Sequence, residues 1–251
     1  MPFTRPRHWL RWLVGAIAAA AVLAAAGPFV YIHFFNRAPA ALSLTPSAGG
    51  SASASASAGT GGTAAAGTAA SGAVAGTWTV GSGSVVGYRV NEVLLGQNAT
   101  AVGRTTSVSG HLTIAGTTAT AASFSVPMDT VHSDKSQRDD QFDGRIMDVA
   151  QYPTGTFTLT SPIDLAPLPA SGAVTSYTVH GRLTLHGTTR AVTFTLTAER
   201  GAARTGDAQI KLAGHIPVLF SDYGIQNPSF AGFVTTQDHG LLEFLLVFSR
   251  A

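Results

Sequence analysis

The sequence predicts an all-β fold, an antiparallel β-barrel of about eight strands with one or two short helices, and three observations support this. Only 11% of the 251 residues are charged, whereas an ordinary soluble domain has about 25%. The polar surface must therefore come from Thr, Ser and Gly, which disfavours a helical bundle because helix surfaces are built mainly from Glu, Lys and Arg. Beyond residue 77, apolar and polar residues alternate in several runs, and Gly-containing turns separate two pairs of runs.

The first segment, residues 1–37, is predicted to be a membrane anchor. Three Arg precede an uncharged stretch, Trp12–Asn36, and Arg37 closes it. As a helix, this stretch is long enough to cross a hydrocarbon core of about 30 Å. The excess of Arg before it places the N-terminus in the cytoplasm and the C-terminal domain outside, as in a single-pass membrane protein. A signal peptide cleaved at Ala24–Ala26 is the alternative and would give a secreted protein. The anchor is favoured because hydrophobicity resumes over Pro28–Phe35.

The second segment, residues 38–76, is predicted to be a disordered linker. It is almost wholly Ala, Ser, Gly, Thr and Pro, carries no charge, and has only three apolar side chains larger than Ala or Pro: Leu42, Leu44 and Val74. Such a segment buries too little apolar surface to offset the entropy lost on ordering. Two interpretations stay open, a tether that lets a domain explore the zone next to the membrane and an inert spacer.

The third segment, residues 77–251, is predicted to be one domain built of strands. In six runs, apolar side chains recur at every second position, as in strands with one buried face. These apolar faces are Val86/Tyr88/Val90, Val108/Leu112/Ile114, Phe124/Val126/Met128, Phe157/Leu159, Val179/Leu183/Leu185 and Val192/Phe194/Leu196. Leu241–Phe248 is apolar on both faces except for Glu243, which predicts a strand buried on both sides. Ala115–Thr118 and His186–Thr189 are predicted to be hairpin turns.

One segment of this domain departs from the strand pattern. Ser133–Val149 holds eight charged residues, a third of all those beyond residue 37. Ser133 is predicted to cap a short helix that runs through Asp143, with Gly144 behind it. The cluster Arg138–Asp140 on this helix is interpreted mainly as structural, tying the helix to the barrel rim, with a functional polar site as the alternative.

Composition and motifs exclude several classes of function. The chain has no Cys, which rules out disulfides, a lipid-modified cysteine, thiol catalysis and Cys-ligated metals. Beyond residue 37 it carries 11 Lys and Arg against 13 Asp and Glu, and this net charge of −2 gives no electrostatic reason to expect nucleic-acid binding. His180 and His186 share a strand face without a third ligand, so no metal is expected. His132 near Asp134 would act as a general base only beside a nucleophile, which the spacing does not place.

An ordered set of motifs resembles the YceI-like family. Its central part is Met128–Ser133, Arg138–Phe142 and Met147–Pro153, followed by Phe157. The flanking motifs, in order, are Trp78–Val80, Ser84–Tyr88 and Gly110–Leu112 before it, and Gly181–Gly187 and Ser221–Ile225 after it. The resemblance covers residues 76–249, and the ordered set is specific.

The resemblance implies an extended lipocalin-like antiparallel barrel, in an exported bacterial protein, whose interior binds a polyisoprenoid or similar amphiphilic lipid. Two positions depart from the family pattern. Gly81 stands where an Asp is usual, and Phe220 stands where an Arg is usual. If that Arg holds a ligand head group in relatives, the ligand of this chain would differ.

The strand faces alone leave a packed core and a ligand cavity both open, and the resemblance favours the cavity. The residues expected to line it and to contact lipid are Tyr88, Phe124, Val126, Met128, Phe142, Phe157, Leu183, Phe194 and Phe244. The expected function is therefore that of an exported, membrane-tethered lipid-binding protein with no catalytic residues, metal or cofactor. The alternatives are a ligand-free structural or partner-binding barrel at the cell surface and a hydrolase or isomerase that uses His132.

Overall fold

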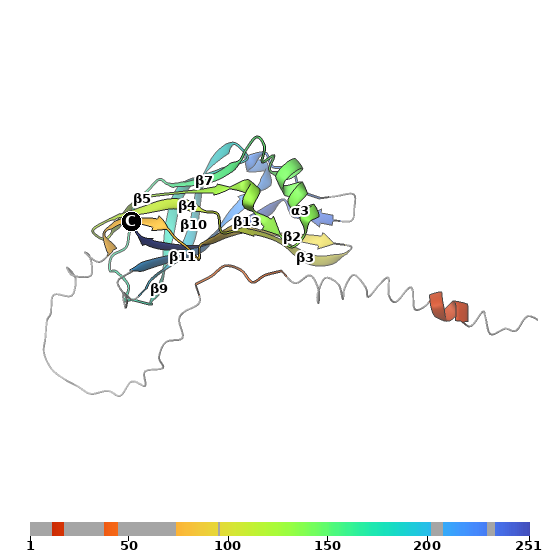
Figure 1. Ribbon diagram of the computed structural model, residues 1–251, viewed down its shortest axis with the longest axis horizontal. Helices are drawn as coiled ribbons and strands as arrows, with labels where there is room; N and C mark the ends of the chain where they lie inside the picture. Colours follow the sequence, from red (N-terminus) through yellow and green to blue (C-terminus); the bar gives the residue numbers. More distant parts are fainter. Residues whose placement is uncertain (1–11, 18–37, 45–73, 95, 202–207, 230–233) are drawn as a thin grey trace, which may run out of the picture.

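The computed structural model describes residues 12–17, 38–44, 74–94, 96–201, 208–229 and 234–251 (Figure 1). In this part of the chain, thirteen strands pair into one sheet, and every pairing is antiparallel. The strands are β1 (Gly76–Val80), β2 (Val85–Leu94), β3 (Gln97–Thr105), β4 (Ser109–Ala115), β5 (Thr118–Pro127), β6 (His132–Ser133), β7 (Thr154–Leu159), β8 (Ile163–Asp164), β9 (Val174–Leu185), β10 (Thr188–Arg200), β11 (Gln209–Leu219), β12 (Val234–Thr236) and β13 (His239–Arg250). The helical turns are η2 (Met128–Thr130), α3 (Ser136–Gln141), η3 (Phe142–Ile146) and η4 (Phe220–Tyr223).

Eight strands close into a barrel, which confirms the predicted fold class. Their order is β1-β4-β5-β7-β9-β10-β11-β13, and β13 pairs back to β1 to complete the ring. The predicted alternating runs lie in these strands or in β2, because one face of each strand must be buried inside the barrel. The predicted two-sided strand Leu241–Phe248 falls within β13.

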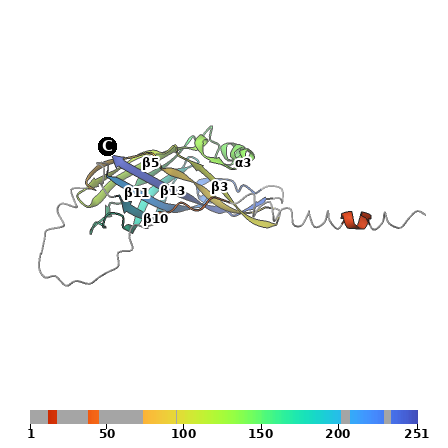
Figure 2. The same ribbon diagram turned by 60° about the horizontal axis from the view of Figure 1, so that its bottom comes forward.

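The barrel is asymmetric along its length. β1 and β2 share one edge of β13, with β1 pairing to Phe248–Arg250 and β2 to Leu241–Leu245. β1 continues the ring to β4, whereas β2 continues to β3 and β6 and so leaves the ring. Figures 1 and 2 show the β2–β3 hairpin extending toward the end where α3 lies. We call this the α3 end and the opposite one the β1 end.

Both predicted hairpin turns are confirmed. Gly116 and Thr117 connect β4 to β5, and His186 and Gly187 connect β9 to β10. His186 and Gly187 have φ values of 47° and 70°. Two consecutive residues with positive φ match the right-handed twist of the flanking strands, which is why two-residue hairpin loops use them.

The helix differs from its predicted bounds. Instead of running from Ser133 to Asp143, α3 begins at Ser136, and a π-helical turn, η3, continues it to Ile146. Ser133 belongs to β6, and its hydroxyl accepts a hydrogen bond from the Lys135 backbone N–H rather than from the first turn of the helix. Gly144 lies inside η3 instead of ending a helix. Contacts with the barrel wall determine where this helical segment begins and ends, and local capping signals do not encode those contacts.

The N-terminal part is only partly described. Residues 12–17 form a short helix, and the rest of the predicted anchor lies outside the described residues. No helix in the described part of the chain is long and apolar enough to cross a membrane. Most of the predicted linker, residues 45–73, also lies outside the described residues.

The two described ends of the predicted linker contact the barrel. Residues 38–44 run along the outside of the barrel (Figure 1). Val74 is only 3% exposed, and its carbonyl oxygen accepts a hydrogen bond from the Trp78 indole N–H at 2.9 Å. The folded part therefore begins at or before Val74, because this side chain shares the core with Trp78.

The interior holds two clusters of buried apolar side chains. The first includes Met128, Leu183 and Phe194 and extends to the α3 end. The second surrounds the fully buried Trp78 and Phe248 at the β1 end. Burial of both clusters is the main stabilising contribution of the fold.

Candidate functional site

The barrel encloses a cavity of about 670 Å³. This volume is in the range of roughly 300–1,000 Å³ that is usual for sites enclosing a small organic ligand. All nine side chains predicted to line an interior site do line this cavity: Tyr88, Phe124, Val126, Met128, Phe142, Phe157, Leu183, Phe194 and Phe244. The period-two pattern was sufficient to place most of them, because inward-facing positions on a barrel strand alternate. That they contact a lipid stays a prediction.

Four phenylalanines form a belt across the interior. Phe124 and Phe157 stack with ring centroids 6.2 Å apart. Phe194 meets Phe157 edge to face at 5.6 Å and Phe244 at 5.9 Å. Such geometries are favourable for aromatic rings. The belt lies where the two buried clusters meet, since Phe124 packs against the β1-end cluster, Phe157 and Phe194 lie with the other, and Phe244 packs against both.

Glycines on the intervening strands make room for this belt. A Cβ placed on Gly181 of β9 would overlap the Phe157 ring. A Cβ on Gly214 of β11 would lie 2.8 Å from the Phe244 ring. The glycines thus let each ring lie flat over the neighbouring strand while its edge remains at the cavity.

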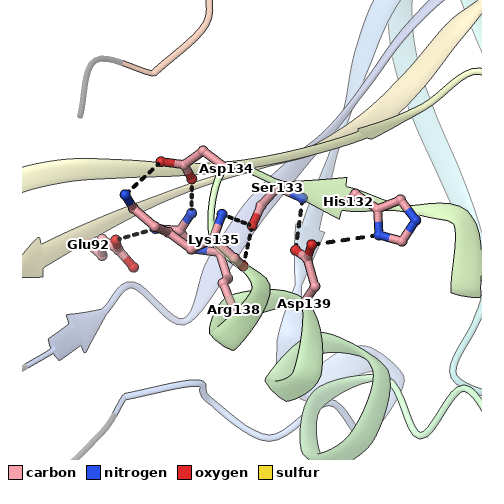
Figure 3. Close-up of polar contacts among 7 residues, drawn as sticks. All are labelled: Glu92, His132, Ser133, Asp134, Lys135, Arg138 and Asp139. Atoms are coloured by element: carbon pink, nitrogen blue, oxygen red, sulfur yellow. Dashed lines mark hydrogen bonds and ion pairs between the residues drawn. The ribbon is translucent and has the colours of Figure 1, made fainter. Parts of the chain in front are cut away.

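Polar side chains of the cavity lining gather at the α3 end. They are Glu92, Lys135, Gln137, Arg138, Gln141 and Arg145, next to Thr236. Arg138 donates to Asp134 at 2.5 Å and to Glu92 at 3.4 Å (Figure 3). The Glu92 side chain is 10% exposed, so a partly buried ion pair holds α3 to β2. Thr156 and Glu243 also line the cavity. The cavity is therefore mainly apolar, and most of its charged residues lie at the α3 end.

Tyr88 lies between these two regions. Its ring stacks on Phe142 of η3 at 5.2 Å and covers Gly103 of β3. Burial raises the pKa of Tyr88 to about 12, although the nearby Arg138 guanidinium acts in the opposite direction. The hydroxyl therefore stays protonated and can donate a hydrogen bond to a ligand atom.

Asp139 holds the start of the helical segment. One carboxylate oxygen accepts the Ser133 backbone N–H at 2.8 Å, and the other lies 3.6 Å from His132 Nδ1 (Figure 3). His132 is 65% exposed. The Ser133 hydroxyl is bound to the Lys135 backbone. These contacts match the structural interpretation of the Arg138–Asp140 cluster and bring no hydroxyl nucleophile to His132.

Asp143, one turn after Asp139, has an unusual environment. Its Oδ1 atom is enclosed without a hydrogen-bond partner. Burial, followed by the negative charge of Asp139, raises the pKa of the Asp143 carboxyl, and His132 lowers it.

Among the described residues, no three His, Asp or Glu side chains gather as metal ligands would. His180 Nδ1 lies 3.0 Å from the Thr193 hydroxyl, and His186 Nδ1 lies 3.2 Å from the Tyr223 carbonyl oxygen.

Sequence reasoning missed two parts of the site. Leu212, Ile216 and Val218 of β11 line the cavity, although their alternation was visible in the sequence. Glu92 and Phe220 also line it. Glu92 carried no local signal, because its role depends on Arg138, which is distant in the chain. Phe220, noted only as a departure from a family pattern, presents an apolar ring to the cavity.

Comparisons with known proteins agree with this geometry. A family model described as YceI-like domain matches residues 78–248. A comparison with curated proteins found no match. A polyisoprenoid binding domain from Saccharophagus degradans, implicated in plant cell wall breakdown, superposes with a TM-score of 0.57 at 18% identity, covering 69% of this chain and 98% of the other. Burkholderia cenocepacia BcnA gives a TM-score of 0.47 at 20% identity, covering 64% and 95%. Campylobacter jejuni YCEI protein gives 0.48 at 16% identity, covering 59% and 84%.

Proposed function

The chain belongs to the YceI-like family, and on that premise we propose that it holds a polyisoprenoid or similar amphiphilic lipid inside its barrel. The observation that carries this proposal is the cavity of about 670 Å³, which is lined mainly by apolar side chains and has most of its charged residues at the α3 end. The lipid chain would lie along the phenylalanine belt, and its head group would lie near Tyr88 and Arg138. The Saccharophagus degradans domain of similar fold, which is a polyisoprenoid binding domain, supports this choice of ligand.

Apolar burial is sufficient to drive this binding. Each CH₂ group removed from water contributes about 0.8 kcal/mol, so ten of them contribute roughly 8 kcal/mol before the costs of ordering the chain. Arg138 already has Asp134 and Glu92 as partners, so an ionic head group is not required. Phe220 adds apolar surface to the cavity lining. The proposed ligand is therefore held mainly by its hydrocarbon part.

In this proposal the protein is a lipid carrier rather than an enzyme. It works outside the cytoplasm, and residues 1–37 hold it to the membrane. The apolar stretch Trp12–Phe35 and the arginines that precede it support the anchor and its direction. The contacts of Ser133 and His132 support a structural role for the polar cluster at the rim. A filled barrel that binds another protein is the competing function.

The test is to fill the cavity and count the bound lipid. Val126→Trp adds volume at a cavity-lining position, and Ser125→Trp adds at least as much volume at the preceding residue, on the opposite face of β5. We expect native mass spectra of the purified wild type to show a bound lipid, and Val126→Trp to carry several-fold less of it with nearly unchanged unfolding. Ser125→Trp should retain the lipid.

Two outcomes would contradict the proposal. A wild-type protein that carries no lipid, and takes none up from polyisoprenoid-containing vesicles, would favour the partner-binding alternative. A packed interior would instead make Val126→Trp lose about 1–3 kcal/mol of stability through overpacking.

A further inference from the structure

The barrel wall at β2, β3 and β13 carries a buried ionic cluster whose carboxylate, Glu243, is also one of the residues that line the cavity. Glu243 alternates along β13 with Leu242 and Phe244, which face the interior, so its carboxylate is on the outer face. Its side chain is nevertheless only 4% exposed. Arg89 Nε donates to it at 2.6 Å, and Arg104 lies 3.5 Å away on β3. A buried carboxylate on an outer wall requires something to cover it.

The residues that cover this cluster belong to the same chain. Arg89 also donates to the carbonyl oxygen of Pro39 at 2.7 Å, and Arg104 donates to that of Ala40. Both acceptors lie in residues 38–44, which run beside β2, β3 and β13 in both views (Figures 1 and 2). Each guanidinium therefore joins Glu243 to the segment, Arg89 through Nε and Nη2 and Arg104 through Nη2 to both acceptors.

Apolar burial accompanies these hydrogen bonds. Val102 lies directly opposite Arg89 in the β2–β3 ladder and so shares the outer face, yet it is only 6% exposed. In the segment itself, Leu42 and Leu44 are half-buried, whereas Pro39, Ala40 and Ala41 are exposed. Leu42 and Leu44 are the only large apolar side chains of residues 38–44. The two largest apolar side chains of the segment, which gain most from leaving water, are thus half-buried.

We propose that residues 38–44 are a strap that docks in cis on the Arg89–Glu243–Arg104 cluster and fixes the barrel relative to the N-terminal segment. The long linker, residues 45–73, then follows the strap instead of preceding it. It is a connection between the strap and β1, and it is not the tether that separates the barrel from residues 1–37. Fully extended it would span about 100 Å, so one chain can supply both strap and barrel.

The direction of the strap gives this docking a consequence for the cavity. β2 runs from the β1 end toward Glu92 at the α3 end, and Arg104 pairs with Gly87, nearer the β1 end than Arg89. The chain passes from Pro39 beside Arg89 to Ala40 beside Arg104 and so moves away from the α3 end. The N-terminal end of the strap, at Ala38, is therefore its end nearer the α3 end. With residues 1–37 in the membrane, as proposed above, the polar end of the cavity faces the bilayer. Only this orientation rests on the proposed anchor.

The test measures the strap directly in the full chain. Because the protein has no Cys, the double variant Ala41→Cys/Val93→Cys accepts two nitroxide labels, one on the strap and one on an exposed position of β2. Electron–electron double resonance should give one narrow distance. Adding Leu42→Ser and Leu44→Ser, which leave the ionic cluster intact, should abolish the narrow component. Adding Arg182→Ala, at an exposed arginine on β9, should leave it unchanged.

Two results would overturn the proposal. A broad distribution in the parent double variant, with a melting curve showing that the barrel is folded, would mean that the strap does not dock. A short distance that arises only on mixing singly labelled chains would mean that the occupant comes from a second copy. Lipid content measured on the same samples separates this question from the proposed function, because loss of lipid with an unchanged distance counts against the lipid site alone.

Discussion

At the scale of single residues, the site is shaped by pairs of an aromatic ring and a facing glycine. Phe157 lies over Gly181, Phe244 over Gly214, and Tyr88 over Gly103. Each pair joins residues far apart in the sequence, so the aromatic positions were predictable from strand parity while their facing glycines were not. The glycines are needed for space, because a ring on one strand occupies the volume that a Cβ on the next would take.

Gly181→Ala is expected to destabilise the protein by about 1–3 kcal/mol, because overpacking forces off-rotamer side chains or backbone shifts. The added methyl group would overlap the Phe157 ring and lie 2.8 Å from the Thr158 carbonyl oxygen, which cannot move independently of β7. Gly144→Ala is the control, since nothing lies within 4 Å of a Cβ there. Urea unfolding of the two variants should differ clearly, and equal stabilities would show that the Phe157 ring is not held against β9.

Tyr88→Phe is expected to make the protein less sensitive to alkali. The folded-state pKa of Tyr88 is raised to about 12, whereas that of an unfolded tyrosine is about 10. The native state keeps the proton that the unfolded state releases, so stability is full below pH 10 and is lost as the pH rises toward 12. At pH 11 the loss from this one group is about 1 kcal/mol. Unfolding curves from pH 8 to 11.5 should therefore fall less steeply for Tyr88→Phe, and identical slopes would place Tyr88 in water.

At the scale of elements, the strands were predictable and the helical segment was not. Period-two alternation depends only on local sequence, so β2, β4, β5, β7, β9 and β10 followed from it, and β13 followed from its run of apolar residues. α3 and η3 take their bounds from contacts with distant residues, above all Arg138 with Glu92 and Tyr88 with Phe142. The Ser133 capping signal was present but was overridden, because Asp139 binds the Ser133 backbone N–H.

Asp139→Ala is expected to lower stability by about 1 kcal/mol, the usual worth of a hydrogen bond that holds a partly buried backbone N–H. Bound lipid should be largely retained, because Asp139 is absent from the cavity lining, whereas Arg138 belongs to it. Asp140→Ala removes the neighbouring, exposed carboxylate and should change stability by less than about 0.5 kcal/mol. Loss of lipid from Asp139→Ala without a change in melting temperature would instead assign the cluster to a head-group site.

At the scale of the whole molecule, the sequence predicted the barrel but not the ends of the linker. Composition correctly indicated that residues 38–76 have little apolar surface to bury. Yet the three large apolar side chains within them, Leu42, Leu44 and Val74, are half-buried or buried. Local composition cannot say whether an isolated apolar residue meets a complementary surface, because that surface exists only once the barrel has formed. For the same reason, Glu243 was visible as an exception in an apolar strand, while its partners were not.

Val74 decides where the folded part begins, and Val74→Ala tests this boundary. The side chain is 3% exposed within the cluster that surrounds Trp78 and Phe248, so its truncation removes buried methyl groups and leaves a cavity. We expect the free energy of unfolding to fall by about 1–3 kcal/mol. Val93→Ala is the matched control, because Val93 is 38% exposed on β2 and should cost less than about 0.5 kcal/mol. If the two variants unfold at the same urea concentration, the barrel begins at β1 alone and residues 74–75 belong to the linker.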